Sequence, residues 1–165
     1  MTPLQRVNDY VYTAEWIKKQ DWHKGKVVLM GFSRGGEAVL RAADPRLTYN
    51  IYREAEGLAM FDAYVAYYPA CSRLPEAPRA PLLIHHGEAD NLASFRQCEY
   101  QRMTHENYQI KTYPGVHHGF DSPGIQVTGS NKYIGRFIAR SYDPSADQTS
   151  RLVTQEFLKK IFSEK

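Results

Sequence analysis

The sequence predicts an α/β domain in which a mainly parallel sheet carries helices on both faces. Short apolar runs rich in β-branched residues alternate along the chain with longer segments of helical character, which is the pattern of successive βαβ units. The chain has 165 residues, the length of one domain, and its 42% hydrophobic and 24% charged residues are typical of globular proteins. We therefore expect residues 1–165 to form a single domain.

The first part of the chain supplies a helix, a strand and a second helix. Apolar residues at helical spacing predict a helix over about residues 4–20. Residues 26–32 form an apolar run bounded by polar residues, which is typical of a strand buried on both faces. Residues 34–43 are rich in alanine and end at an Asp-Pro pair, which predicts a short helix. Residues 47–60 are expected to hold a helix and a connection.

The rest of the chain repeats this alternation. Strands are expected over residues 61–68, 81–86 and 109–113, and helices over residues 93–107 and 145–162. Residues 121–143 are rich in Gly, Ser and Asn, so we expect a loop there. In a parallel sheet of this kind, reactive groups lie at the carboxyl ends of the strands.

Charge and composition exclude several classes of partner. The 21 Lys and Arg residues exceed the 18 Asp and Glu residues by only three and form no cluster, which speaks against a nucleic-acid binder. No apolar run approaches the ~18 residues of a membrane span. The first 16 residues lack the apolar core of a signal peptide, and the sequence assigns no compartment. Two cysteines are too few for a disulfide scaffold and do not have metal-ligand spacing, so we expect no metal and no cofactor.

The first motif that carries chemistry is Gly-Phe-Ser-Arg-Gly-Gly at residues 31–36, between a predicted strand and a predicted helix. A serine at the tip of such a sharp turn has strained backbone, and glycines on either side avoid a clash. The helix that follows offers backbone N–H groups to a developing oxyanion. The motif predicts Ser33 as a nucleophile and the backbone N–H of Arg34 as an oxyanion donor. The alternative is a glycine-rich turn with an incidental serine.

A nucleophilic serine needs a base, and the base needs an orienting acid. Asp90 follows the strand at residues 81–86, and His118 follows the strand at residues 109–113. Their order in the chain, Ser-Asp-His, is that of α/β-hydrolases. Taken alone, Asp90 could instead cap a loop, and His118 could be a surface histidine.

Four segments carry a resemblance to a known family: GFSRGG, HHGEAD, YPGVHHGFDSPG and YDPSAD. With them the chain resembles the dienelactone hydrolase family of α/β-hydrolases over nearly its whole length. The resemblance implies Ser33 as nucleophile, Asp90 as acid and His118 as base. The founding enzymes of the family use a cysteine nucleophile, so Ser33 favours a general carboxylic-ester hydrolase over a dienelactone hydrolase.

Several neighbouring residues have more than one interpretation. The Arg34 side chain could meet a substrate carboxylate or form a surface salt bridge. His117 could compete with His118 as base or line the substrate pocket, although its position favours packing behind the site. Relatives in the family suggest a disulfide between Cys71 and Cys98, whereas the sequence alone leaves bridged and free thiols equally open.

The resemblance also implies that family members place several strands, and a loop with the second oxyanion donor, before the first helix of this chain. Their sheet has about eight strands, against four expected here. We therefore expect an N-terminally truncated α/β-hydrolase-like domain whose strand at residues 26–32 exposes an unpaired edge. Self-association or a partner chain is expected to cover that edge.

These observations predict a serine hydrolase that cleaves small carboxylic esters or lactones through an acyl-enzyme. The alternative is a truncated homologue, catalytically weak or inactive, that acts as a subunit or binding module. A peptidase of the same fold would share the triad, but the sequence contains no element that would hold a peptide.

Overall fold

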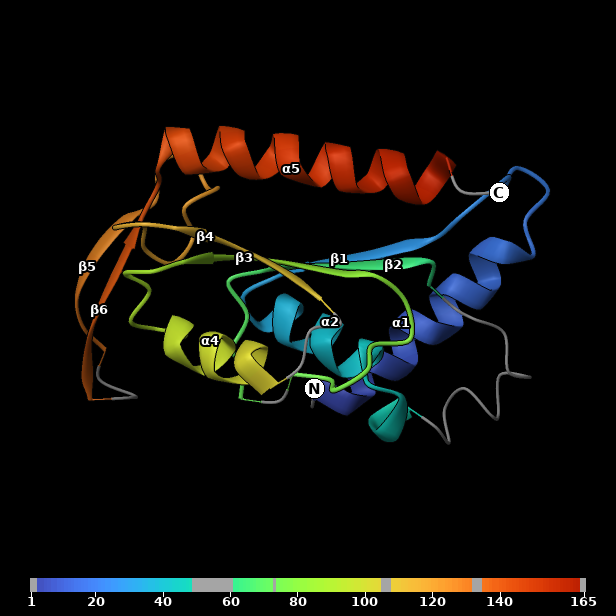
Figure 1. The fold of residues 1–165 in the computed structure, drawn as a ribbon, viewed down its shortest axis with the longest axis horizontal. Helices are drawn as coiled ribbons and strands as arrows, with labels where there is room; N and C mark the ends of the chain where they lie inside the picture. The colour runs from blue at the N-terminus through green and yellow to red at the C-terminus, as the bar shows by residue number, and fades with distance from the viewer. Residues whose placement is uncertain (1–2, 49–60, 73, 105–107, 132–134, 164–165) are drawn as a thin grey trace.

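The computed structural model describes residues 3–48, 61–72, 74–104, 108–131 and 135–163 (Figure 1). In chain order, its main elements are α1 (Pro3–Lys18), β1 (Val28–Phe32), α2 (Arg34–Ala43), β2 (Ala63–Tyr67), β3 (Leu82–Gly87), α4 (Phe95–Thr104), β4 (Gln109–Tyr113), β5 (Gln126–Asn131), β6 (Arg136–Ser141) and α5 (Pro144–Ser163). None of the described helices has the length and apolar character needed to cross a membrane.

Strands β1 to β4 form one parallel sheet in the order β1-β2-β3-β4, which confirms the predicted α/β fold class. Every residue of β2 and β3 is buried, as expected for the interior strands of a parallel sheet. Because the strands are parallel, their carboxyl ends lie at the same end of the sheet. The loops that follow the strands converge there.

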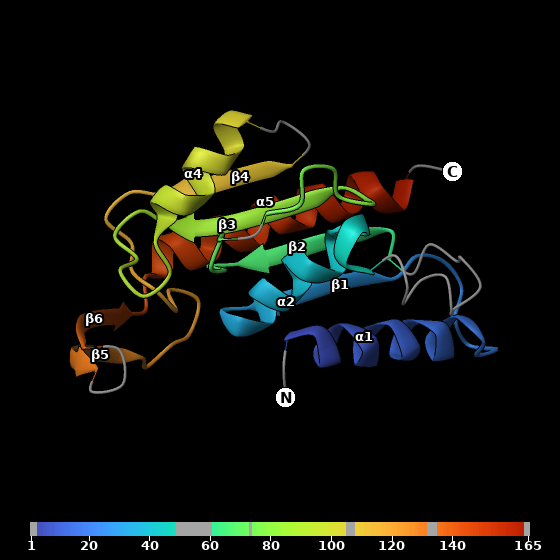
Figure 2. The same cartoon turned by 90° about the horizontal axis from the view of Figure 1, so that it is seen from below.

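Helices cover both faces of this sheet: α1, α2 and α4 lie on one face, and α5 crosses the other (Figures 1 and 2). The alternation of side chains along β2 explains how one strand serves both layers. Tyr64 and Ala66 pack in the core beneath α1 and α2, whereas Val65 and Tyr67 pack in the core beneath α5.

Strand β1 is an edge of the sheet in the described part of the chain. Met30 and Phe32, which lie on this strand, have 41% and 44% of their surfaces exposed. Both are large apolar side chains, so this edge presents apolar surface to solvent.

The prediction of a loop over residues 121–143 is wrong for residues 126–131 and 136–141. Strands β5 and β6 pair there as an antiparallel ladder, with Gly129 opposite Ile138. Gly, Ser and Asn weaken the strand signal in the sequence, but backbone hydrogen bonds between the two strands do not depend on those side chains. Of the helix and connection expected over residues 47–60, all but the first two residues lie outside the described residues.

Candidate active site

Ser33 occupies a sharp turn between β1 and α2, with φ 52° and ψ −117°. Two glycines make this turn possible. A Cβ atom on Gly31 would collide with the carbonyl oxygen of Gly35, and one on Gly36 would lie 2.9 Å from the carbonyl oxygen of Tyr67. The Ser33 N–H donates to that same Tyr67 oxygen at 2.9 Å, which fixes the turn against β2.

Asp90 lies in the turn that follows β3 and is 5% exposed. Its Oδ1 accepts hydrogen bonds from the N–H groups of Leu92 and Ala93, both at 2.9 Å. This is the capping role that the sequence left open as an alternative, but it occupies only one carboxylate oxygen. The second oxygen, Oδ2, is directed at His118.

His118 lies on the loop after β4 and joins the other two residues. Its Nδ1 is 2.7 Å from Asp90 Oδ2, and its Nε2 is 2.8 Å from Ser33 Oγ. A carboxylate can only accept, so Nδ1 carries the proton and Nε2 accepts from the serine hydroxyl. His118 is 1% exposed, so water does not compete for these bonds. The structure thus brings together the three residues that the sequence selected.

Tyr68, which the sequence analysis did not select, lies against His118. The centroids of the two rings are 4.5 Å apart. The phenol donates to Asp121 Oδ1 at 2.6 Å. Burial, followed by this hydrogen bond, raises the pKa of Tyr68 above its ordinary value, so the phenol stays protonated. Its position at the end of a predicted strand was the signal that could have indicated it.

The side chains of Arg34 and His117, the two other candidate site residues, lie in different surroundings. Arg34 is the first residue of α2 and its side chain is exposed. Its backbone N–H, like others in the first turn of a helix, has no carbonyl partner within the helix. His117 is half-buried, and its Nδ1 donates to the carbonyl oxygen of Ala89 at 3.0 Å, behind Asp90. This contact matches packing more closely than a role as base.

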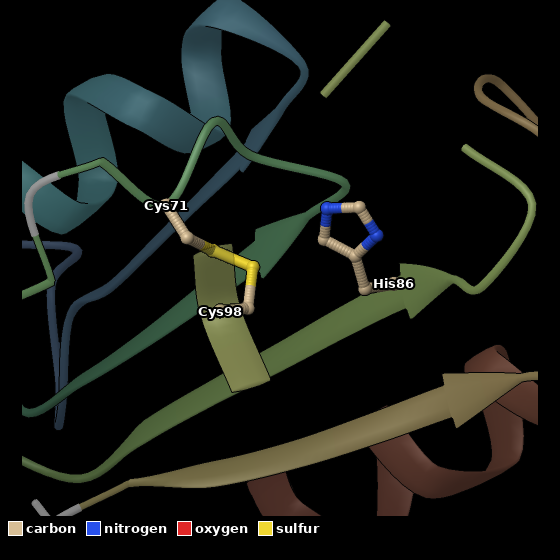
Figure 3. Close-up of side chains that lie close together, drawn as sticks. All are labelled: Cys71, His86 and Cys98. Carbon is tan, nitrogen blue, oxygen red and sulfur yellow. A yellow bond between two sulfur atoms is a disulfide. The ribbon is translucent and has the colours of Figure 1, made fainter. Parts of the chain in front are cut away.

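Cys71 and Cys98 are joined by a disulfide, with their Cα atoms 4.9 Å apart. The bond links the segment after β2 to α4, and both cysteines are fully buried. His86 lies beside them (Figure 3), with donor atoms of the three residues all within 4.8 Å of one another. Both sulfurs are used in the disulfide, and both His86 nitrogens face carbonyl oxygens, of Gly87 and Pro69. In this state the group is a cross-link rather than a set of metal ligands.

The sequence matches the model of the dienelactone hydrolase family over residues 2–162. The chain belongs to the dienelactone hydrolase family. The resemblance expected from the four sequence segments is therefore confirmed. A comparison with curated proteins finds no match for this chain.

Solved structures related to this dienelactone hydrolase family member share its fold. They include an esterase from Thermogutta terrifontis (TM-score 0.63, 18% identity) and a putative dienelactone hydrolase from Klebsiella pneumoniae (0.68, 16%). A carboxylesterase from Lactobacillus plantarum is also similar (0.67, 15%). These alignments cover 100%, 99% and 96% of this chain, but only 68%, 62% and 69% of the respective relatives. The family match places the chain among carboxylic-ester hydrolases of the dienelactone hydrolase type, and the solved structures show that it shares their fold.

Proposed function

We propose that this chain is a serine hydrolase that cleaves small carboxylic esters or lactones through an acyl-enzyme. One observation carries the proposal: the hydrogen-bond chain from Ser33 through His118 to Asp90, with distances of 2.8 and 2.7 Å. A serine, a histidine and a buried carboxylate in this order form the nucleophile, base and orienting acid of acyl transfer.

In the first step, Ser33 Oγ attacks the ester carbonyl as its proton passes to His118 Nε2. The imidazole becomes an imidazolium, and the Asp90 carboxylate stabilises that charge without taking the proton. The carbonyl oxygen becomes an oxyanion, for which the Arg34 N–H at the start of α2 is a donor. Collapse of this intermediate breaks the bond to the alcohol oxygen, which receives the proton from His118.

In the second step, water attacks the acyl group on Ser33. His118 Nε2 takes a proton from the water and returns it to Ser33 Oγ as the acid leaves. The net reaction is ester plus water to acid plus alcohol, and it needs no further reactant. Because Asp90 holds the Nδ1 proton, Nε2 is free to act as base in both steps.

Short acyl groups are the first substrates to test. Two structures of the Thermogutta terrifontis esterase hold butyrate and propionate. This relative is 19% identical to the chain, so it guides the choice of probe and does not assign a substrate.

The test is hydrolysis of 4-nitrophenyl acetate and 4-nitrophenyl butyrate by the full chain. Ser33→Ala is expected to reduce turnover to the background rate. Asp90→Asn is expected to lower kcat by roughly 10⁴-fold with little change in KM, since the imidazole would be held in the wrong tautomer. Arg34→Gln serves as a control, because it keeps the backbone N–H and changes only an exposed side chain. Turnover by Ser33→Ala equal to wild type would reject the proposal.

The second candidate is a weak or inactive homologue that acts as a subunit or binding module. It is the alternative that the sequence leaves open beside the serine hydrolase. It predicts a folded chain with little turnover of either ester, and a binding activity that Ser33→Ala leaves unchanged. Ser33-dependent turnover by the isolated chain would reject it.

A further inference from the structure

We propose that Tyr68 is a positioning residue that holds the His118 imidazole in place and stabilises its charged form during acyl transfer. The inference rests on the proposed function, and three independent features of Tyr68 carry it: its backbone, its ring and its hydroxyl group.

The backbone of Tyr68 has φ 38°, in the left-handed region that side chains other than glycine rarely adopt. In the described residues, Ser33 is the one other non-glycine residue with positive φ. The two lie at the carboxyl ends of neighbouring strands. Such conformations cost free energy and persist where the side chain has a role that glycine could not fill. The contacts of the Tyr68 side chain, which glycine would lack, are therefore the place to look for such a role.

The ring of Tyr68 is 4% exposed and lies against His118, with centroids 4.5 Å apart and planes inclined by 60°. Phe120 packs on Tyr68 with centroids 5.5 Å apart, which limits movement of the tyrosine ring. Confined in this way, Tyr68 blocks rotation of the imidazole away from Ser33. An aromatic ring within about 6 Å also attracts a cation, so it favours the imidazolium that forms when His118 takes the serine proton.

The hydroxyl group fixes the ring to the same loop that carries His118. It donates to Asp121 Oδ1 at 2.6 Å, and Asp121 is three residues after His118. The backbone N–H of Tyr68 donates to the His85 carbonyl oxygen at 2.7 Å, which anchors the residue to β3. Tyr68 thus connects the sheet to the histidine loop.

Other groups also act on His118, and one of them, Asp121, loses the phenol that donates to it whenever Tyr68 is replaced. Asp90, on the loop after β3, contacts Nδ1 directly. His86, on β3, interacts electrostatically with His118. Arg140, on β6, pairs with His118 through the backbone, and Asp121 lies on the histidine loop itself. Tyr68→Leu and Tyr68→Phe both remove the hydroxyl from Asp121, so a difference between these two variants reports the loss of the ring.

The experiment compares Tyr68→Leu, Tyr68→Phe and Tyr68→Gly with wild type. Leucine keeps the site apolar but removes the aromatic ring, phenylalanine keeps the ring, and glycine relieves the backbone while removing the ring. Tyr64→Leu is the matched control, because Tyr64 is a buried tyrosine of β2, the strand that ends just before Tyr68, but packs in the core on the other face of the sheet.

For Tyr68→Leu we expect kcat to fall ten-fold or more, while KM changes less than three-fold. The acidic limb of the pH profile of kcat/KM should shift to lower pH, because the imidazolium of His118 loses the aromatic ring beside it. Tyr68→Gly should show the same loss despite an easier backbone. Tyr68→Phe, which keeps the ring, should have a pH profile closer to that of wild type than Tyr68→Leu has. A folded Tyr68→Leu with unchanged kcat and pH profile would overturn the inference, as would an equal change in Tyr64→Leu.

A second measurement does not depend on turnover. NMR titration of the His118 imidazole gives its pKa directly in wild type and in each variant. If no form of the chain hydrolyses an ester, the proposed function fails, and the titration still decides the inference. A lower His118 pKa in Tyr68→Leu but not in Tyr68→Phe would support the role of the ring, and equal values in all three would contradict it.

Discussion

Nε2 of His85, on β3, lies 2.9 Å from Oγ1 of Thr154, on α5. Its Nδ1 is 2.8 Å from the Tyr113 hydroxyl on β4, and the Tyr67 hydroxyl on β2 is 3.0 Å from the same Thr154 oxygen. This buried network joins three strands to the helix on one face of the sheet. His85 is fully buried, and burial lowers its pKa from 6.5 to about 3.

The low pKa of His85 makes the stability of the protein dependent on pH. The folded form keeps the imidazole neutral, whereas the unfolded chain takes up a proton below pH 6.5. The stabilisation that comes from keeping His85 neutral is therefore fully present above pH 6.5, and it is lost as the pH falls toward 3. We expect His85 to account for a loss of about 2 kcal/mol in the free energy of unfolding between pH 6.5 and 5. Urea denaturation at several pH values measures it.

Two variants separate this effect from other titrating groups. His85→Gln should reduce the slope of unfolding free energy against pH in this range, and His23→Gln should keep the wild-type slope. Some slope should remain in His85→Gln, because burial also lowers the pKa of His86. The same slope in His85→Gln and wild type would contradict the assignment.

The disulfide between Cys71 and Cys98 should contribute to stability by restricting the unfolded chain. The two residues are 27 positions apart. A loop of that length corresponds to about 3–4 kcal/mol in the chain-entropy model. We expect the free energy of unfolding of the Cys71→Ala/Cys98→Ala double variant to be lower by that amount. The double variant should therefore unfold at a lower urea concentration than wild type. An unchanged midpoint, with the wild-type thiols shown to be oxidised by mass spectrometry, would count against this contribution.

The glycines of the Ser33 turn differ in how much space a side chain would have at each position. Gly31→Ala places a methyl group against the Gly35 carbonyl oxygen, whereas Gly35→Ala meets no atom within 4 Å. We expect Gly31→Ala to destabilise the chain by roughly 1–3 kcal/mol. The accompanying shift of Ser33 should lower ester turnover by about 100-fold. Gly35→Ala is the matched control, and equal activity of the two variants would show that the turn does not need the space at Gly31.

The exposed edge of β1 predicts that the chain associates with itself. Met30 and Phe32 are 41% and 44% exposed on this edge, and such surface favours pairing with a second chain. We expect oligomers in light scattering at micromolar concentration, and a shift toward monomer in Met30→Lys. A monodisperse wild-type monomer would contradict the prediction.

The sequence was sufficient to predict the parallel sheet, and the three residues that it selected for the site lie within hydrogen-bond distance of one another. The apolar run at residues 81–86 has a strong strand signal because both of its faces are buried. Residues 26–32 were expected to be buried in the same way, but Met30 and Phe32 are exposed because β1 is an edge strand in the described part of the chain. Ser33, Asp90 and His118 were recognisable because each follows a predicted strand, and the carboxyl ends of parallel strands lie at the same end of the sheet. The strand pattern in the sequence and the parallel order of the strands therefore both indicate the carboxyl end of the sheet as the position of the site.

Other features depend on contacts that local sequence does not encode. Strands β5 and β6 consist largely of residues with weak strand preference, and they are stabilised by pairing with each other. The position of Tyr68 against His118 brings together residues 50 positions apart, and its positive φ has no signature in the sequence. The Cys71–Cys98 bond likewise required the relative placement of two elements.

The most direct test of the account is covalent labelling of the folded chain with a fluorophosphonate, which reacts with activated serines. Intact-mass and peptide mass spectrometry would locate the adduct. The account predicts one adduct, on Ser33, formed rapidly in wild type, much more slowly in His118→Ala, and not in Ser33→Ala or in urea-unfolded protein. No adduct on Ser33 in the folded protein, or equal labelling of folded and unfolded chains, would contradict it.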